Sequence, residues 1–254
     1  MQRLLPDFRV LKPEEVYGDL TFPNGAGERP YTVINMVTTV DGKASLGGKA
    51  FGLGSRVDRM VMRRIRAAAD GLLVGAETLR RENVDPTVPT QLESRRVALG
   101  MSPQPAAIVV TATADLPLER TFFKATGFSR VIVTTESASA ERVARLERYA
   151  RVLRIGANAV DLPTMMTALA RSLGLRRVVV EGGPTLNAAL IAEGLVDELF
   201  WTVAPKILGG AAMRTMVEGR PLPLDRIPHL DLMSLHRYDS ELFIRYRLVS
   251  GPSG

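Results

Sequence analysis

The amino-acid sequence predicts an α/β protein with a mostly parallel sheet and an antiparallel C-terminal edge. Short apolar runs alternate with helical patterns between residues 31 and 193, which is typical of parallel strands joined by helices. Two extended runs, residues 229–238 and 241–248, flank Asp239-Ser240 and predict a hairpin. The chain has 254 residues, of which 46% are apolar and 24% charged, so it can bury a sizeable core.

Each element follows from its periodicity and its end signals. Prolines and the run Asn24-Gly25-Ala26-Gly27 indicate an N-terminal arm over residues 1–28, and a single domain follows over residues 29–250. Ser55 is a candidate N-cap for a helix with an apolar face. Residues 83–104 are rich in proline and polar side chains and predict a long loop. The expected strands are residues 31–38, 71–74, 106–111, 130–134, 152–155, 178–181 and 198–203, and the expected helices are residues 55–69, 139–149, 163–173, 184–193 and a short one from Ala76.

Composition excludes several classes of protein. No apolar run reaches the length of a membrane span, and the N-terminus turns polar too early for a signal peptide, so we expect a cytoplasmic protein. Cysteine is absent and only His229 and His236 are histidines, which argues against disulfides, a cysteine nucleophile and a zinc site. The net charge is +6, with 28 arginines spread along the chain. Because aromatics are only 6% and no basic tail stands out, we expect a small phosphorylated ligand rather than a nucleic acid or a membrane.

The most informative stretch lies at residues 178–187, where a buried strand ends in Glu181-Gly182-Gly183-Pro184. The two glycines let backbone N–H groups approach a ligand, and the helix from Pro184 points its positive end there. This pattern favours phosphate binding. A plain tight turn is the alternative, since the three-glycine dinucleotide fingerprint is absent. Glu181 ends a strand, where α/β sheets place ligands, although a surface acid capping an amide has the same pattern.

Three further patterns are weaker. Asp41-Gly42-Lys43 follows a strand and is either a solvated turn or an acid–ammonium pair facing a pocket. Gly75 offers a second strand-to-helix turn with free backbone N–H groups. The helix after Ser55 carries an arginine stripe that is either its solvated face or includes a phosphate ligand. The stripe consists of Arg56, Arg59, Arg63 and Arg66.

In their order and spacing these stretches resemble the reductase domain of riboflavin biosynthesis, a family with the dihydrofolate reductase fold. The resemblance covers about residues 29–249. The matching pieces are residues 39–43, 65–67, 70–78, 180–186, 194–199 and 204–210.

The resemblance implies an α/β/α fold of the dihydrofolate reductase type, NADPH as cofactor and a homodimer. It implies reduction of the ribose of a ribosylaminopyrimidine 5′-phosphate to the ribityl form by direct hydride transfer. By position, the cofactor would be held by Gly75, Thr78, Thr111, Gly182, Gly183, Pro184, Thr185 and Leu186. Asp41, Lys43 and Glu181 would be catalytic, and Arg66 would bind the substrate phosphate. The zinc deaminase that often accompanies this domain needs cysteine ligands, which the chain lacks.

Two departures lie on the substrate side of the family pattern. After Glu82 the family has two acids, proline and soon an arginine, whereas here the next arginines are Arg95-Arg96. The family's contact before the arginine-striped helix falls near Ala50, Phe51 or Gly52. Two alternatives therefore stay open: a reductase of dihydrofolate or another heterocycle on the same scaffold, and a non-catalytic NADP(H)-binding protein.

Overall fold

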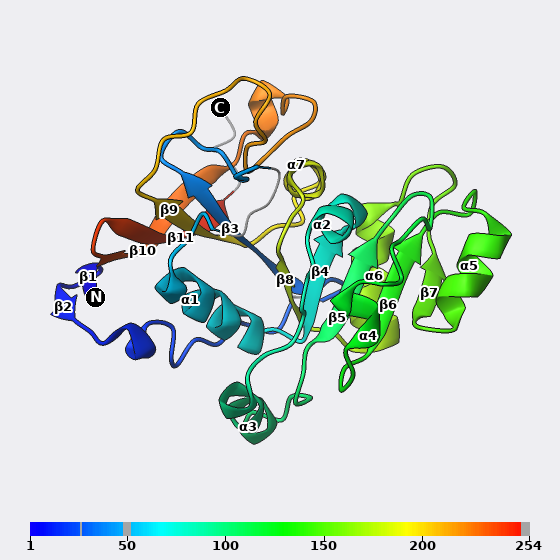
Figure 1. Cartoon of the computed structure of the whole chain (residues 1–254), viewed down its shortest axis with the longest axis horizontal. Coiled ribbons are helices and arrows are strands. Elements are labelled where there is room, and N and C mark those ends of the chain that lie inside the picture. Colours follow the sequence, from blue (N-terminus) through cyan, green and yellow to red (C-terminus); the bar gives the residue numbers. More distant parts are fainter. Residues whose placement is uncertain (26, 48–51, 250–254) are drawn as a thin grey trace. The chain divides into compact units, whose positions relative to one another are not determined.

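The computed structural model describes residues 1–25, 27–47 and 52–249 (Figure 1). Its contacts divide the chain into two compact units. The first unit comprises Met1–Thr21, Thr32–Ile65 and Pro184–Gly254, and the second comprises Phe22–Tyr31 and Arg66–Gly183. The expected arm of residues 1–28 and domain of residues 29–250 stay a prediction. Residue 26 of that arm and residue 250 lie outside the described residues.

The second unit is built on parallel strands. They lie in the order β8 (Arg177–Val180), β4 (Gly71–Gly75), β5 (Ala106–Val110), β6 (Arg130–Thr134) and β7 (Arg151–Arg154). Every neighbouring pair in this series is parallel. The carboxyl ends of all these strands therefore meet at one edge of the sheet, which is the edge where α/β proteins bind ligands.

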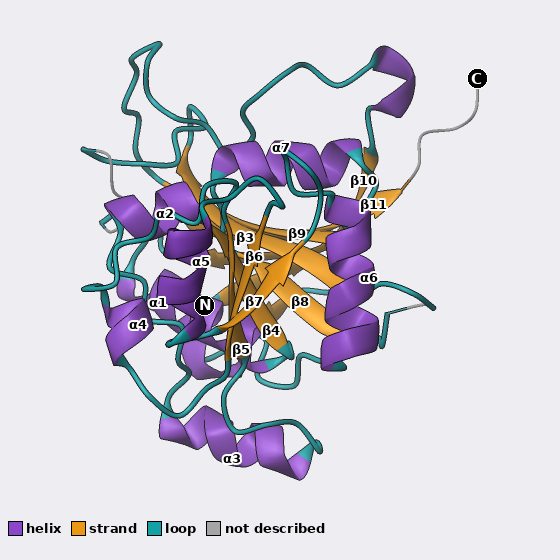
Figure 2. Ribbon diagram, turned by 90° about the vertical axis from the view of Figure 1, so that its right-hand side faces the viewer, coloured by secondary structure: helices purple, strands orange, loops and turns teal. Residues whose placement is uncertain are grey.

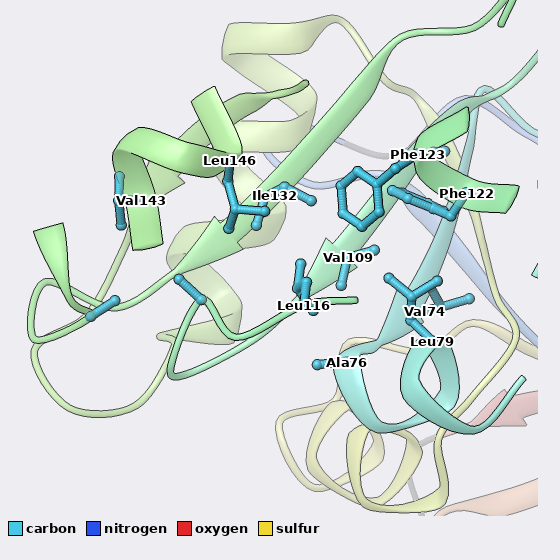
Figure 3. Packing of buried hydrophobic residues seen from close by; sticks show 13 residues of the cluster. Val74, Ala76, Leu79, Val109, Leu116, Phe122, Phe123, Ile132, Val143 and Leu146 are labelled. Atoms are coloured by element: carbon cyan, nitrogen blue, oxygen red, sulfur yellow. The ribbon is translucent and has the colours of Figure 1, made fainter. Parts of the chain in front are cut away.

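Helices cover both faces of these strands (Figure 2). On one face α2 (Ala76–Arg81), α4 (Thr121–Lys124) and α5 (Ala140–Glu147) pack with the strands, and on the other lies α6 (Leu162–Leu173). Figure 3 shows the first of these cores. It includes Val74, Val109, Ile132, Phe122, Phe123 and Leu146.

Side-chain alternation along the strands separates the two cores. Val109 and Ile132 face α5, whereas Ile108 faces the end of α6. A Cβ on Gly71 would lie 2.9 Å from Ile108 Cδ1 and 3.3 Å from Leu175 Cδ1, so glycine is needed where α6 ends against the sheet.

The first unit supplies the antiparallel part. β3 (Tyr31–Thr39) pairs in parallel with β9 (Glu198–Ala204). From β9 the sheet continues antiparallel through β11 (Glu241–Val249), β10 (His229–Tyr238), β1 (Gln2–Leu5) and β2 (Arg9–Val10). The predicted fold class and the C-terminal hairpin are confirmed. Strands β1 and β2 were not predicted, because β1 pairs with β10, more than 200 positions away, and β2 in turn pairs with β1.

Two longer helices belong partly or wholly to the first unit: α1 (Arg56–Ala67) and α7 (Pro184–Ala192). The predicted N-cap of α1 is confirmed, because Ser55 Oγ accepts hydrogen bonds from the amides of Val57 and Asp58 at 3.0 and 3.2 Å. Ser55 Oγ in turn donates to the buried Glu241 carboxylate at 2.5 Å, which ties the start of α1 to the C-terminal hairpin.

One predicted loop contains a helix. Residues 83–104 include α3 (Thr90–Ala98), which begins after Pro89. Two short 3₁₀ turns, η1 (Pro13–Glu15) and η2 (Leu224–Arg226), also lie outside the predicted elements. Across residues 1–25, 27–47 and 52–249, none of the helices is both long and apolar enough to cross a membrane.

His236 is a buried histidine in β10 of the first unit. Its ring packs edge-on against Tyr17 with centroids 5.4 Å apart, and its buried Nδ1 has no hydrogen-bond partner in the described part of the chain. Burial, with a smaller contribution from the charge of Arg3, lowers the pKa of His236 to about 4. The side chain is therefore neutral in the folded protein at pH 7.

We expect His236 to make the protein less stable in acid. Below about pH 6.5 the unfolded chain binds a proton at this residue, whereas the folded protein does so only near pH 4. As the pH is lowered from about 6.5 to about 4, the free energy of unfolding should therefore decrease. The slope should approach about 1.4 kcal/mol per pH unit for one proton. Urea unfolding at pH 7, 6, 5 and 4.5 measures this slope. His236→Phe should flatten it, whereas the exposed His229→Gln should not; equal slopes in both variants would contradict the prediction.

Candidate active site

A glycine turn, whose two residues Gly182 and Gly183 carry no side chains, follows β8 in the second unit. The Glu181 amide donates to the Leu73 carbonyl at 3.0 Å, and the Gly75 amide donates to the Gly182 carbonyl at 2.8 Å. Gly182 has φ of +90°, a conformation that a side chain disfavours, and its peptide bond to Gly183 is cis. These bonds join the carboxyl ends of β8 and β4, so the two predicted glycine turns lie together.

Gly183 keeps space open beside α2. A Cβ on Gly183 would lie 3.2 Å from Thr78 Oγ1 and, apart from its chain neighbours, would meet no other heavy atom of the described residues within 4 Å. Gly75 is the N-cap of α2, with φ of −78° and ψ of 150°. The structure thus brings together four predicted cofactor residues of the second unit: Gly75, Thr78, Gly182 and Gly183. The next predicted residues, Pro184, Thr185 and Leu186, form the first turn of α7.

Thr111 lies at the same carboxyl edge, directly after β5. Its amide donates to the Val133 carbonyl at 3.0 Å, and its side chain is buried, but its hydroxyl has no hydrogen-bond partner among the residues that the structure describes. A buried hydroxyl without a partner is costly unless a ligand or water satisfies it. The bare glycine backbone and this unpaired hydroxyl fit a polar, phosphate-bearing nucleotide along the strand ends.

Arg66 and Glu181 form a bidentate ion pair in the second unit. Nε and Nη2 of Arg66 donate to the two carboxylate oxygens of Glu181 at 2.7 and 2.6 Å. The third donor, Nη1, binds the Asp85 carbonyl at 2.7 Å. Their side chains are only 8% and 11% exposed, so the pair is largely removed from solvent. This geometry holds the Glu181 carboxylate in one orientation beside the glycine turn.

The charge state of Arg66 follows from two opposing effects. Burial by itself lowers the pKa of Arg66, but the adjacent Glu181 charge and its hydrogen bonds outweigh burial and raise that pKa. The guanidinium is therefore cationic. Because Glu181 and Asp85 occupy these donors, Arg66 positions Glu181 in this structure, and its predicted contact with a substrate phosphate stays a prediction.

Arg96 lies beside the site, and the sequence did not predict that it is buried there. Its side chain is buried in the second unit, and Nη1 donates to the carbonyls of Ala67 and Ala69 at 3.0 and 2.5 Å. Nε donates to the Ser102 carbonyl at 2.9 Å. Arg96 therefore caps the C-terminal end of α1, directly beside Arg66, and anchors the segment that contains α3. No local pattern distinguishes it from the exposed arginines.

The turn at Asp41 belongs to the first unit. The Asp41 carboxylate accepts hydrogen bonds from the amides of Leu208 and Gly209 at 3.1 and 2.7 Å. The Thr39 hydroxyl first, and then these two amides, lower the pKa of Asp41 to about 2. Asp41 is thus an ionised carboxylate that holds the loop after β9.

Lys43 does not pair with Asp41. Its amide binds Thr39 Oγ1 at 2.9 Å, and within the described part of the chain its ammonium forms no hydrogen bond or ion pair. The acid–ammonium pair considered from the sequence is therefore absent, and the Lys43 charge is available to a ligand.

Of the residues considered before α1, Ala50 and Phe51 lie outside the described residues, whereas Gly52 accepts a hydrogen bond from Lys206 at 2.6 Å through its carbonyl.

The fold and these groups define an α/β protein with a glycine turn and an oriented carboxylate at the ligand-binding edge of parallel strands. The family model described as the RibD C-terminal domain matches residues 30–244. The chain therefore belongs to the RibD C-terminal domain family.

Two similar proteins carry the same name, 2,5-diamino-6-ribosylamino-4(3H)-pyrimidinone 5′-phosphate reductase. The protein from Methanothermobacter thermautotrophicus is 31% identical over 220 residues, covering 86% of this chain and 98% of its own length. The protein from Aquifex aeolicus is 32% identical over 230 residues, covering 88% and 98%. Among solved structures, a pyrimidine reductase-like protein from Corynebacterium diphtheriae has a TM-score of 0.79 at 24% identity, covering 94% of this chain and 99% of that one. This last likeness concerns the fold alone.

Proposed function

We propose that this protein is an NADPH-dependent reductase of riboflavin biosynthesis. Its substrate is a ribosylaminopyrimidine 5′-phosphate, either 5-amino-6-(5-phosphoribosylamino)uracil or its diamino analogue. In the reaction the open-chain imine of the ribose gains a hydride at carbon and a proton at nitrogen, which yields the ribitylamine. Bound NADPH supplies the hydride, so the protein has to align the reactants and place charge rather than provide a nucleophile.

The observation that carries this proposal is the Glu181 carboxylate, held by Arg66 one residue before the Gly182-Gly183 turn. The turn suits a diphosphate, and the carboxylate lies next to it on the chain, as a substrate group beside a cofactor requires. Family membership and the reductase names of the two relatives support the same reading.

Each group has a distinct part in the proposal. The backbone of Gly182 and Gly183, with Pro184, Thr185 and Leu186 in the first turn of α7, holds the cofactor diphosphate. Gly75, Thr78 and Thr111 line the rest of that site. Glu181 accepts hydrogen bonds from substrate N–H or hydroxyl groups, and its negative charge stabilises the protonated imine nitrogen. Asp41 and Lys43 belong to the first unit, and their contacts with the substrate stay predictions of the family resemblance.

A cytoplasmic homodimer without a nucleic-acid or membrane partner completes the proposal. These points extend the expectations from composition and family resemblance.

The test is a turnover assay with the purified chain, NADPH and each of the two ribosylaminopyrimidine 5′-phosphates, followed by nicotinamide absorbance. Parallel reactions contain NADH, no pyrimidine, or dihydrofolate. We expect oxidation of NADPH only when a ribosylaminopyrimidine 5′-phosphate is present, and the product should carry a ribityl chain by mass spectrometry, two mass units heavier than the substrate.

The other outcomes discriminate the rival functions. Turnover of dihydrofolate without turnover of either pyrimidine would assign the chain to a heterocycle reductase on the same scaffold. Binding of NADPH without turnover of any substrate would assign it to a non-catalytic binder. Both outcomes would overturn the proposed substrate.

A further inference from the structure

We propose that Arg142 and Arg145 bind the 2′-phosphate of the cofactor adenosine and so select NADPH over NADH. This inference rests on the proposed function, because it concerns the same dinucleotide. It concerns a pocket of the second unit that is lined neither by the glycine turn nor by the Arg66–Glu181 pair.

The pocket is open to solvent and has a volume of about 570 Å³. It lies between the loop after β5, which contributes Asp115, and the start of α5. Its lining residues are Asp115, Ser139, Glu141, Arg142 and Arg145. The loop is held in place by Arg80 of α2, whose Nη2 donates to the Asp115 carbonyl at 2.9 Å. A built, polar pocket therefore exists before any ligand binds.

The two guanidinium groups are available to an anion. Arg142 and Arg145 are three residues apart on α5, so their side chains lie on the same face of the helix. Arg142 Nη1 makes one long hydrogen bond, 3.4 Å, to the Thr113 carbonyl. Within the described part of the chain, neither guanidinium forms an ion pair, although Asp115 and Glu141 line the same pocket. Guanidinium forks match phosphate oxygens in two-point fashion.

The pocket lies along the edge that the cofactor would follow. From the glycine turn at β8 and β4, the next strand ends belong to β5 and β6, and α5 begins after β6. Two strand spacings separate β4 from β6, which is roughly 10 Å and comparable with the length of an adenosine group. A dinucleotide with its diphosphate at Gly182-Gly183 would therefore carry its adenosine toward the pocket.

Two buried hydroxyl groups lie at the strand ends between the glycine turn and the pocket. Thr111 Oγ1 after β5 and Thr134 Oγ1 at the end of β6 are both buried, and neither has a hydrogen-bond partner within residues 1–25, 27–47 and 52–249. By strand alternation both residues lie on the face of Val109 and Ile132, which is the face covered by α5. Unsatisfied hydroxyls between the glycine turn and the pocket suit the hydroxyls and ring nitrogens of an adenosine.

The acids of the pocket define the competing ligand. A carboxylate beside an adenosine ribose accepts hydrogen bonds from the free 2′-hydroxyl of NADH, whereas an arginine accommodates the 2′-phosphate of NADPH. Asp115 and Glu141 would oppose a phosphate, and the arginines would attract it. Because the arginines carry five donors each and form no ion pair with any described residue, we assign the pocket to the phosphate. Glu141→Gln should accordingly tighten NADP⁺ binding and weaken NAD⁺ binding, because the carboxylate that opposes the phosphate and accepts from the free 2′-hydroxyl is lost.

The experiment is titration calorimetry of NADP⁺ and NAD⁺ with the wild-type chain, Arg142→Gln, Arg145→Gln and Arg148→Gln. Neither ligand can react in the absence of a reduced substrate. For Arg142→Gln we expect the Kd of NADP⁺ to rise about tenfold, because a charged hydrogen bond to phosphate is lost, while the Kd of NAD⁺ changes less than twofold. Arg148 is an exposed arginine that does not line the pocket, so its variant should match the wild type.

A second ligand isolates the phosphate. The fragment 2′,5′-ADP should bind the wild type and lose affinity in Arg142→Gln, whereas 5′-ADP should bind both proteins alike. Loss of NADP⁺ and NAD⁺ affinity to the same degree, or no loss in either arginine variant, would overturn the inference and leave the proposed function intact. A wild-type chain that binds neither dinucleotide would refute both, and the turnover assay would then fail as well.

Discussion

Replacing Glu181 with glutamine is expected to lower kcat/KM for the ribosylaminopyrimidine phosphate by about 100-fold, the scale of losing one positioned charge at the reacting centre. Glutamine keeps the size of the side chain but removes the negative charge that Arg66 orients. Cofactor affinity should change less than twofold, since the glycine turn stays intact. Steady-state kinetics and NADPH titration measure both effects.

Two controls make the Glu181 result specific. Glu147→Gln changes an exposed acid at the end of α5 and should leave kcat/KM unchanged. Thermal unfolding distinguishes catalytic loss from instability, because Glu181→Gln leaves the Arg66 charge buried without its partner. Breaking a buried pair costs about 3 kcal/mol, so assays belong well below the melting temperature. Full activity in a folded Glu181→Gln protein would return this residue to a structural role.

The Arg66–Glu181 pair also contributes to stability, and this contribution can be separated from its proposed role in orienting a substrate ligand. Arg66→Met should destabilise the protein strongly, because it leaves the Glu181 carboxylate buried and alone, whereas the double variant Arg66→Met, Glu181→Leu should recover much of the loss. The double variant would nevertheless be inactive. Stability without activity is the outcome that distinguishes a positioned substrate ligand from a structural ion pair.

Replacing Gly183 with valine is expected to raise the Kd of NADPH at least tenfold, since a branched side chain blocks the close approach of a ligand to backbone. The new Cβ would lie 3.2 Å from Thr78 Oγ1, and a small shift of that hydroxyl can accommodate it. The rest of the side chain would occupy the space beside the turn. The variant should therefore fold and lose cofactor affinity.

Smaller and distant substitutions calibrate the Gly183 effect. Gly183→Ala adds a single methyl group and should give an intermediate Kd, whereas Ala98→Val at the exposed end of α3 should match the wild type. NADPH fluorescence titration measures all three variants. An unchanged Kd in a folded Gly183→Val protein would remove the diphosphate from this turn.

Arg96 explains how the altered segment after Glu82 is accommodated. By capping the end of α1, it fixes the backbone next to Arg66, and Arg66 in turn binds the Asp85 carbonyl. The segment that departs from the family pattern is thus attached to the oriented carboxylate through two arginines.

The sequence by itself determined the features that rest on local pattern. Alternating apolar runs and helical periodicity predicted the parallel strands β4, β5, β6 and β8, and Ser55 was predicted as an N-cap. The strand-acid-glycine-glycine-proline run predicted the turn after β8 and, with the other motifs in their order, the family. These succeed because turns, caps and strand periodicity depend on neighbouring residues.

Only the tertiary structure decided which charged groups meet. The Arg66–Glu181 pair joins residues 115 positions apart, and Asp41 binds amides 167 and 168 positions away instead of pairing with Lys43. Strand β1 forms because β10 offers it an edge, and β2 pairs with β1 in turn. Arg96 is buried because a helix end lies beside it. None of these contacts leaves a local signature, because an exposed and a buried arginine have the same neighbours in sequence and differ only in what the fold brings to them.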